Sequence, residues 1–254
     1  KTLDAARPCA VCFEDCTRVR MSDFMVNNSP NWTIHPVRCE NVTIDNLTIV
    51  NPFNSPNTDG IDPESCRNVR ITGCHIDVGD DCIAVKAGTE DALEDVPCEN
   101  IAITGCTMVH GHGGVVLGSE MTGCVFDGTD RGIRIKSRRG RGGAVEDVSV
   151  TGIVMNDVLC PLVINLMYFC GKDGKLPIVS DPNAQPVTDA TPHVRRIRMA
   201  DIVVTNAKSA AACLYGLPEA PLEDISIVNT QIHLVEDTPS FPVMNAVQQP
   251  VTLA

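Results

Sequence analysis

The sequence predicts an all-β protein that folds as a right-handed, single-stranded parallel β-helix. A degenerate unit, Asn/Asp-apolar-x-apolar-x-x-apolar-x-apolar, occurs seven times along the chain. Most copies lie 23 to 32 residues apart, which is the length of one coil of a solenoid. No segment has the length and the 3.6-residue period of a long helix. Stacked coils of this kind bury one continuous column of aliphatic side chains.

Each copy of the unit predicts two short strands joined by a bend. The first apolar positions of the copies are 19, 42, 69, 101, 148, 197 and 225. Apolar and polar residues alternate within each half, as in a half-buried strand. The two residues between the halves often include a glycine (Gly73, Gly105 or Gly152), which turns the chain through a corner. Cys74 and Cys106 occupy equivalent positions, so we expect them to stack inside the solenoid rather than form a disulfide.

Two long steps between copies predict irregular coils. The step of 47 residues needs two coils, but only Met121 and Thr122 separate the half-unit at 123–126 from the preceding strand, so we expect this coil to lack one strand. The step of 49 residues contains residues 156–192, which are rich in Pro, Gly and Asp and predict an inserted loop. We expect residues 1–254 to form a single β-helix domain, incomplete at its N-terminus, with a missing C-terminal part as an open alternative.

Composition and charge exclude several classes of function. The 254 residues carry a net charge of −12, whereas binding to nucleic acid or to anionic membranes needs a basic surface, so neither is an expected partner. No apolar run is long enough to span a bilayer. The segment 131–141 departs from this average, because six of the 20 Lys and Arg residues fall within its eleven positions. This segment indicates a site for an anion.

Most of the 13 cysteines are predicted to be buried free thiols. Their number is odd, and Cys9-x-x-Cys12 has no second pair that would complete a zinc site. Buried thiols pack as small hydrophobic groups. This use of cysteine favours a reducing, cytoplasmic compartment, with secretion as the alternative, and we expect neither a metal nor a cofactor.

Four further strands carry polar groups between the copies of the unit. If the central apolar residue of each strand stacks on the next coil, Asp59 and Asp81 stack as well, because each lies two residues before it. Coils in such a stack are about 4.8 Å apart. The four segments are Asn57-Thr58-Asp59-Gly60-Ile61-Asp62, Gly79-Asp80-Asp81-Cys82-Ile83, Gly111-His112-Gly113-Gly114-Val115 and Arg131-Gly132-Ile133-Arg134-Ile135-Lys136. We therefore expect the carboxylates, the histidine and an Arg/Lys pair to share one strip.

The chemistry of this strip favours cleavage of an acidic sugar polymer. Neighbouring acids raise one another's pKa, because like charges disfavour ionisation of the last to titrate, and a general acid near neutral pH needs such a raised pKa. Paired carboxylates hydrolyse glycosidic bonds. Strand alternation directs Arg134 and Lys136 outward and Ile135 into the core, which makes a two-pronged receptor for a carboxylate. Each motif alone is more typical of a turn or a solvated face; their joint order indicates a site.

The order Asn-Thr-Asp-Gly, Asp-Asp, Gly-His-Gly, Arg-Ile-Lys resembles that of the polygalacturonases of glycoside hydrolase family 28. The resemblance implies a right-handed parallel β-helix enzyme that cuts α-1,4-linked galacturonan with inversion. It implies that Asp80 is the general acid that protonates the leaving oxygen, and that Asp59 and Asp81 activate water. It also implies that His112 maintains the ionisation of the site and that Asn57 orients the acids.

The same resemblance implies residues that bind the substrate, an acidic polysaccharide or oligogalacturonide. Arg134 and Lys136 correspond to the pair that binds the galacturonate carboxylate, and Tyr168 resembles the substrate-contacting tyrosine of the family. Two further segments, 28–36 and 127–143, resemble those of bacterial members, many of which release residues from chain ends. Exo action is therefore expected.

Three alternatives stay open at this point. A pectate lyase on a similar β-helix would use Ca²⁺ and an arginine base and would release an unsaturated product. A rhamnogalacturonan hydrolase would share the fold, although His112 and the Arg/Lys pair favour plain galacturonan. A binding or structural β-helix without catalysis is favoured by the absence of an N-terminal cap and by the shortened coil near 121–123.

Overall fold

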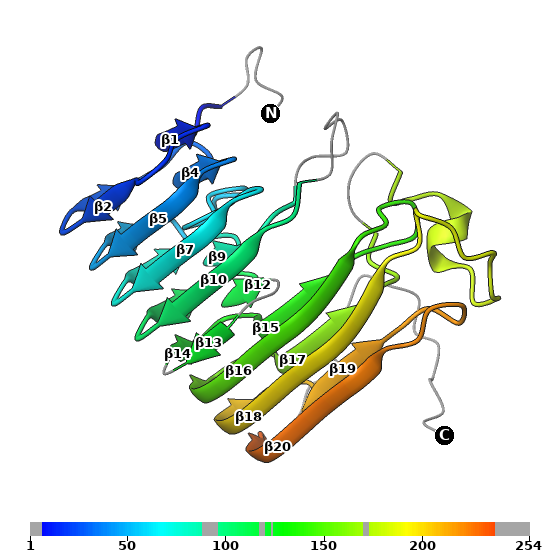
Figure 1. Ribbon diagram of the computed structural model, residues 1–254. Helices are drawn as coiled ribbons and strands as arrows, with labels where there is room; N and C mark the ends of the chain where they lie inside the picture. The colour runs from blue at the N-terminus through cyan, green and yellow to red at the C-terminus, as the bar shows by residue number, and fades with distance from the viewer. Residues whose placement is uncertain (1–6, 88–95, 117–119, 123, 170–172, 237–254) are drawn as a thin grey trace.

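The protein is a right-handed parallel β-helix, as predicted from the repeated unit. The computed structural model describes residues 7–87, 96–116, 120–122, 124–169 and 173–236, with the backbone alone for 120–122. Their strands stack into one extended solenoid, whose coils follow one another from β1 to β20 (Figure 1). Throughout the described part of the chain, every pairing between the named strands is parallel and joins strands of neighbouring coils.

One side of the solenoid is formed by short strands and isolated bridges, which we call the site sheet. Bridges at Ile61 and Glu64 link its first two strands to the rest. The strands are β1 (Val11–Glu14), β4 (Ile34–Val37), β9 (Ile83–Ala84), β12 (Val115–Val116), β15 (Arg131–Lys136), β17 (Cys160–Asn165) and β19 (Ala212–Tyr215). The predicted stack is confirmed, because Ile61 pairs with Ile83, Ile83 with Val115, and Val115 with Ile133.

The copies of the repeated unit form the other, larger sheet. In the early coils each copy gives two strands that meet at a bend; in the last coils the two halves merge into one long strand. The first halves are β2 (Arg20–Ser22), β5 (Glu40–Asp45), β7 (Arg67–Thr72), β10 (Glu99–Thr104) and β13 (Glu120–Thr122). The second halves are β3 (Met25–Asn27), β6 (Thr48–Val50), β8 (His75–Val78), β11 (Thr107–His110) and β14 (Val125–Asp127). The merged strands are β16 (Ala144–Asn156), β18 (His193–Ala207) and β20 (Glu223–Leu234).

The polar residue that opens each copy has a conformational role. Asn41, Asn68 and Asn100 have φ values of 59°, 57° and 53°, in the left-handed region that asparagine tolerates better than most residues. Their side chains also form a ladder: the amide of Asn68 donates to Asn41 (3.2 Å), and that of Asn100 donates to Asn68 (3.1 Å). The recurring Asn therefore bends the chain and links successive coils.

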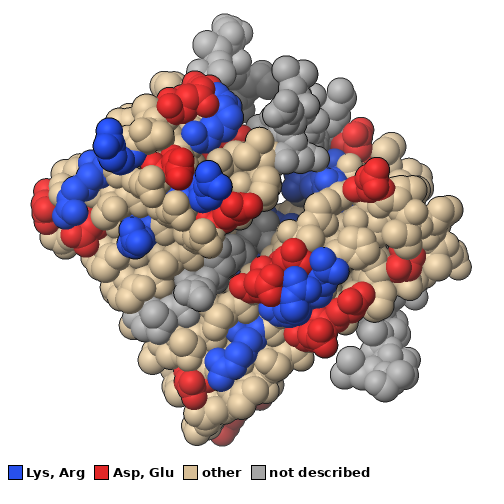
Figure 2. Space-filling model, viewed as in Figure 1, with Lys and Arg blue, Asp and Glu red and all other residues tan. Residues whose placement is uncertain are grey.

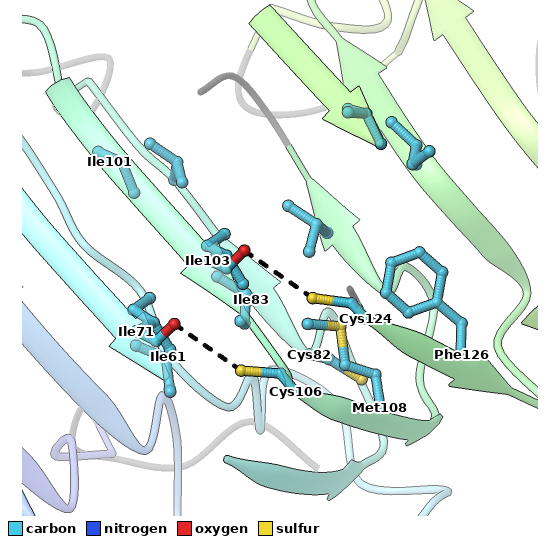
Figure 3. Packing of buried hydrophobic residues seen from close by; sticks show 14 of the residues in the cluster. Ile61, Ile71, Cys82, Ile83, Ile101, Ile103, Cys106, Met108, Cys124 and Phe126 are labelled. Atoms are coloured by element: carbon cyan, nitrogen blue, oxygen red, sulfur yellow. Dashed lines mark hydrogen bonds between the residues drawn. The ribbon is translucent and has the colours of Figure 1, made fainter. Parts of the chain in front are cut away.

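The core contains the predicted aliphatic and thiol stacks. Cys74, Cys106 and Cys124 are buried thiols at equivalent positions of successive coils. The thiols of Cys106 and Cys124 point toward the carbonyl oxygens of Ile71 and Ile103, each 3.9 Å away (Figure 3). A buried thiol here fills space and makes weak hydrogen bonds to the neighbouring coil.

The expectation that the coil near 121–123 lacks a strand is wrong. Residues Glu120–Thr122 form β13, which pairs with β10 on one side and β16 on the other. The strand is three residues long, whereas β10 has six, because only three residues separate it from β12. A hollow of about 800 Å³ therefore lies where a longer strand would run, between the N-terminal parts of β10 and β16 (Figure 2).

The inserted loop begins later than the predicted position 156. Residues Cys160–Asn165 form β17, which pairs with β15 and β19 in the site sheet. The loop was predicted from the Pro, Gly and Asp content of the whole segment 156–192, but Cys160 and Leu162 pair with β15 on either side of Pro161, because a single missing N–H does not prevent pairing. The insertion after β17 contains η1 (Pro177–Ser180), a 3₁₀ helix of four residues. Among the described residues, no helix is long and apolar enough to cross a membrane.

Candidate active site

Three carboxylates meet on the site sheet as the sequence predicted. Asp59 precedes the bridge at Ile61, and Asp80 and Asp81 precede β9 on the next coil. One oxygen of each lies within 4.8 Å of the others. Gly60 makes this approach possible, because a Cβ at that position would lie 2.4 Å from the carbonyl oxygen of Cys82. The Asn-Thr-Asp-Gly motif therefore reflects close backbone packing between the coils that carry the acids.

Asp80 is held as a carboxylate by the groups around it. Its side chain accepts hydrogen bonds from the backbone N–H groups of Asn57 and Asp81, each at 3.0 Å, and contacts His112 Nδ1 at 3.2 Å. Burial raises the pKa of Asp80, but these hydrogen bonds outweigh it and lower the pKa to about 2. The same contact with Asp80 raises the pKa of His112 above its usual value. The prediction that crowding raises the pKa of every acid is therefore wrong for Asp80.

Asp59 shows the raised pKa that the sequence predicted. Its side chain is buried, and its nearest cation is Lys86, whose Nζ lies 3.5 Å from Oδ2. Burial is the main cause that raises the pKa of Asp59 to about 6, and Lys86 opposes it. Repulsion from Asp80 and Asp81 adds to the rise. At neutral pH a small fraction of Asp59 carries a proton.

Asp81 joins the acids to the predicted cationic pair. Lys136 Nζ lies 2.6 Å from Asp81 Oδ2, and Arg134 Nη1 lies 3.6 Å from Oδ1. Both cations also face the ring of Tyr168, at 4.9 Å for Arg134 and 5.7 Å for Lys136. The alternation is as predicted, since Ile135 lies in the core. In this arrangement the two-pronged receptor contacts Asp81, and Lys136 keeps part of its surface open to a ligand.

Asn57 contacts the site through its backbone. Its N–H donates to Asp80, whereas its side-chain oxygen accepts a hydrogen bond from Arg7 at 3.1 Å. The residue has a φ of 59°, which directs the N–H toward the acid. Asparagine favours this left-handed conformation, so the residue type matters here for the turn it permits.

Residues that sequence reasoning did not assign lie beside the acids. Lys86 contacts Asp59 and pairs with Asp62 at 2.9 Å, and its ammonium lies 4.4 Å from the centre of the Trp32 ring. Trp32 in turn meets the ring of His35 edge to face. Two features of the sequence could have drawn attention to them: the hydrophobic run that precedes Lys86, and the second Asp of Asn-Thr-Asp-Gly-Ile-Asp, which is Asp62. Only the register between coils shows that these residues are partners.

Cationic side chains supply the countercharge of the three acids. Within the described part of the chain, these acids are the one group of His, Cys, Asp and Glu side chains with the spacing of a metal site. Asp59 contacts Lys86, Asp80 contacts His112, and Asp81 contacts Lys136. Each of the three acids thus has a cationic side chain beside it, an arrangement that suits acid–base chemistry.

Comparison with known proteins identifies the family. The family model described as glycosyl hydrolases family 28 matches residues 1–232. The chain belongs to glycosyl hydrolase family 28. A Vitis vinifera protein named "Probable polygalacturonase" is 36% identical over 236 residues, which are 88% of this chain and 46% of the relative. An endo-polygalacturonase of Pectobacterium carotovorum is 33% identical over 172 residues, 65% of this chain and 42% of the relative.

A solved structure agrees with this assignment. The exopolygalacturonase of Thermotoga maritima superposes with a TM-score of 0.74 at 32% identity, covering 89% of this chain and 50% of that one. The family prediction is confirmed, while the relatives include plant and bacterial proteins with both exo and endo names. This family 28 chain spans about half the length of the relatives it matches.

Proposed function

We propose that this family 28 chain hydrolyses α-1,4-galacturonosyl linkages of polygalacturonate, with inversion and from chain ends. One observation carries the proposal: three acids within 4.8 Å of one another adjoin a buried Arg134 and a half-buried Lys136. Carboxylates cleave a glycosidic bond, and a paired guanidinium and ammonium recognise the carboxylate of an acidic sugar. Family membership supports the same reaction.

The proposed roles follow the contacts. Asp80 gives a proton to the leaving oxygen, and Asp59 and Asp81 hold and activate the attacking water. Because the pKa of Asp80 is about 2 and that of His112 is raised, the pair holds its proton on His112 before substrate binds. The hydrogen bond between them supplies a route for that proton to reach the leaving oxygen through Asp80.

Substrate binding uses the other side of the acids. Lys136 and Arg134 bind the galacturonate carboxylate in competition with Asp81, and the ring of Tyr168 covers both cations. Moving Lys136 from Asp81 to the substrate frees a carboxylate oxygen of Asp81 to accept a hydrogen bond from the attacking water. Exo action is supported by the similarity to the Thermotoga maritima exopolygalacturonase.

Incubation with polygalacturonate and with short oligogalacturonides tests the proposal. We expect galacturonate monomer as the product; a ladder of oligomers would replace exo by endo action, and an unsaturated product would indicate a lyase. Asp80→Asn should abolish release of reducing ends. Asp77→Asn, on β8 and paired with His110, is the matched control and should keep it. Absence of any product from the parent chain would refute the hydrolase function and favour a β-helix that only binds.

A further inference from the structure

Asp62 is the most deeply buried acid of the site, and the proposed mechanism gives it no role. Its exposed fraction is 0%, compared with 4% for Asp59 and 2% for Asp81. It lies beside Ile61 in the site sheet, between the coils that carry His35 and Ala84. A carboxylate at this depth is costly unless a cation and hydrogen-bond donors compensate for the lost water.

Lys86 is in ion-pair contact with both Asp62 and Asp59. Its Nζ lies 2.9 Å from Asp62 Oδ1 and 3.5 Å from Asp59 Oδ2. One ammonium thus faces two buried carboxyl groups. If both were ionised, the cluster would retain one buried negative charge, which a proton on one of the two acids removes.

The other titratable groups nearby do not supply that missing charge. The thiol of Cys9 feels Asp62, and burial raises the pKa of Cys9, so this thiol stays neutral. His35 Nε2 lies 2.8 Å from Glu64 Oε2, and this hydrogen bond lowers the pKa of Glu64, so His35 contacts Glu64 and not Asp62. Asp80 and Asp81, which face Asp59 from the next coil, are themselves acids and strengthen the demand for a proton.

The unsatisfied carboxyl oxygens of Asp59 and Asp62 indicate which of the two acids carries the proton. Apart from the ion pair with Lys86, Asp59 Oδ1 and both oxygens of Asp62 are buried and accept no hydrogen bond from the described residues. The Asp59 side chain lies within hydrogen-bonding reach of Asp62. A proton on Asp62 turns one of these unsatisfied oxygens into a donor and gives Asp59 the partner that it lacks.

We propose that Asp62 is a positioning residue that stays a neutral carboxylic acid and donates a hydrogen bond to Asp59, while Lys86 compensates the charge of Asp59. Burial also raises the pKa of Asp62 well above its usual range. The donated bond fixes the orientation of Asp59 and favours its ionised form, which holds water. The link to catalysis rests on the proposed hydrolase function, whereas the protonation of Asp62 does not.

The first test measures that protonation directly. The ¹³C carboxyl signal of Asp62, assigned by its loss in Asp62→Asn, is followed between pH 4 and pH 8 in the parent protein. We expect the chemical shift of a protonated acid throughout. An ionised Asp62 at pH 7 overturns the inference, whether or not the protein hydrolyses galacturonan.

The second test uses the pH profile of galacturonan hydrolysis. Asparagine mimics a neutral acid that can donate, so Asp62→Asn should change kcat by less than about threefold and leave the acid limb in place. Asp62→Leu lacks the donor and should move that limb upward by about one pH unit, because Asp59 loses a bond to its charged form. A downward move in Asp62→Asn would show that a negative charge was removed beside Asp59 and would refute the proposal. Asp77→Asn is again the control, and if Asp62→Leu fails to fold, the Asp62→Asn profile and the ¹³C titration still decide.

Discussion

Replacing Asp59 by asparagine should stabilise the protein while it abolishes activity. In the folded protein burial raises the pKa of Asp59 from 3.8 to about 6. At neutral pH the side chain is nevertheless mostly ionised, so the native state carries the cost of a buried charge. An asparagine side chain at this position would have a similar shape without that charge. Lys86, which compensates Asp59 in the parent, would then have the carboxyl group of Asp62 at 2.9 Å, free to ionise as its partner.

The magnitude follows from the pKa. A rise from 3.8 to about 6 corresponds to on the order of 3 kcal/mol at neutral pH, since one pH unit is worth about 1.4 kcal/mol. Between these two values the native state binds more protons than the unfolded state, so the contribution of Asp59 falls as pH rises from about 4 to about 6. Burial of the amide cancels part of the gain. We therefore expect Asp59→Asn to raise the free energy of unfolding by about 1–3 kcal/mol at pH 7 and by little at pH 4.

Urea unfolding at both pH values provides the measurement. Circular dichroism follows the loss of the β-helix, and Asp77→Asn serves as a control at an acid outside the buried cluster. An equal effect of Asp59→Asn at pH 4 and pH 7, or a destabilisation at pH 7, would refute the reasoning. An equal effect at the two pH values would mean that Asp59 has an ordinary pKa. A destabilisation at pH 7 would mean that the ion pair between Asp59 and Lys86 stabilises the folded protein by more than the burial of Asp59 costs.

Two further substitutions and one product measurement test other parts of the structure and mechanism. Arg139→Ala should destabilise the protein by about 3–5 kcal/mol in urea unfolding, because Arg139 forms a buried pair with Glu219 and donates to three carbonyl groups of the inserted loop. Arg139→Lys should lose less stability than Arg139→Ala, and an equal loss in the two variants would contradict this account. Tyr168→Ala should raise KM for trigalacturonate about 2- to 30-fold through lost cation–π contacts with Arg134 and Lys136, whereas Tyr168→Phe should not. Proton NMR of the first product should show the β anomer, and the α anomer would exclude inversion.

The fold and the position of the acids could be predicted because both depend on local periodicity. Alternation fixes which side chains enter the core, and stacking of equivalent apolar residues then aligns Asp59 with Asp81. The partnership of Lys86 with Asp62 could not be predicted in this way. It depends on the register between coils and on the conformation of the long Lys86 side chain, and neither can be inferred from a pattern in the sequence.

Errors in the prediction arose where strand length departed from the repeat. The strand β13 has only three residues, too few for the alternation that identified its neighbours. In β17 every residue is buried, so the strand shows no alternation, and Pro161 disguised it further. Both strands exist because neighbouring coils offer unpaired backbone groups on each side, which is a tertiary effect.

The short coil leaves the site intact because the shortening falls on the opposite sheet. On the site sheet Val116 pairs directly with Arg134, and the N–H of Gly114 donates to the carbonyl of Gly132 at 3.1 Å, so successive coils keep the spacing of one strand. That spacing brings Lys136 to 2.6 Å from Asp81. The lost residues instead leave the hollow between β10 and β16. The spacing of the acids and cations in this solenoid is therefore set by register within the site sheet, and loops that lead into the other sheet can change length without altering it.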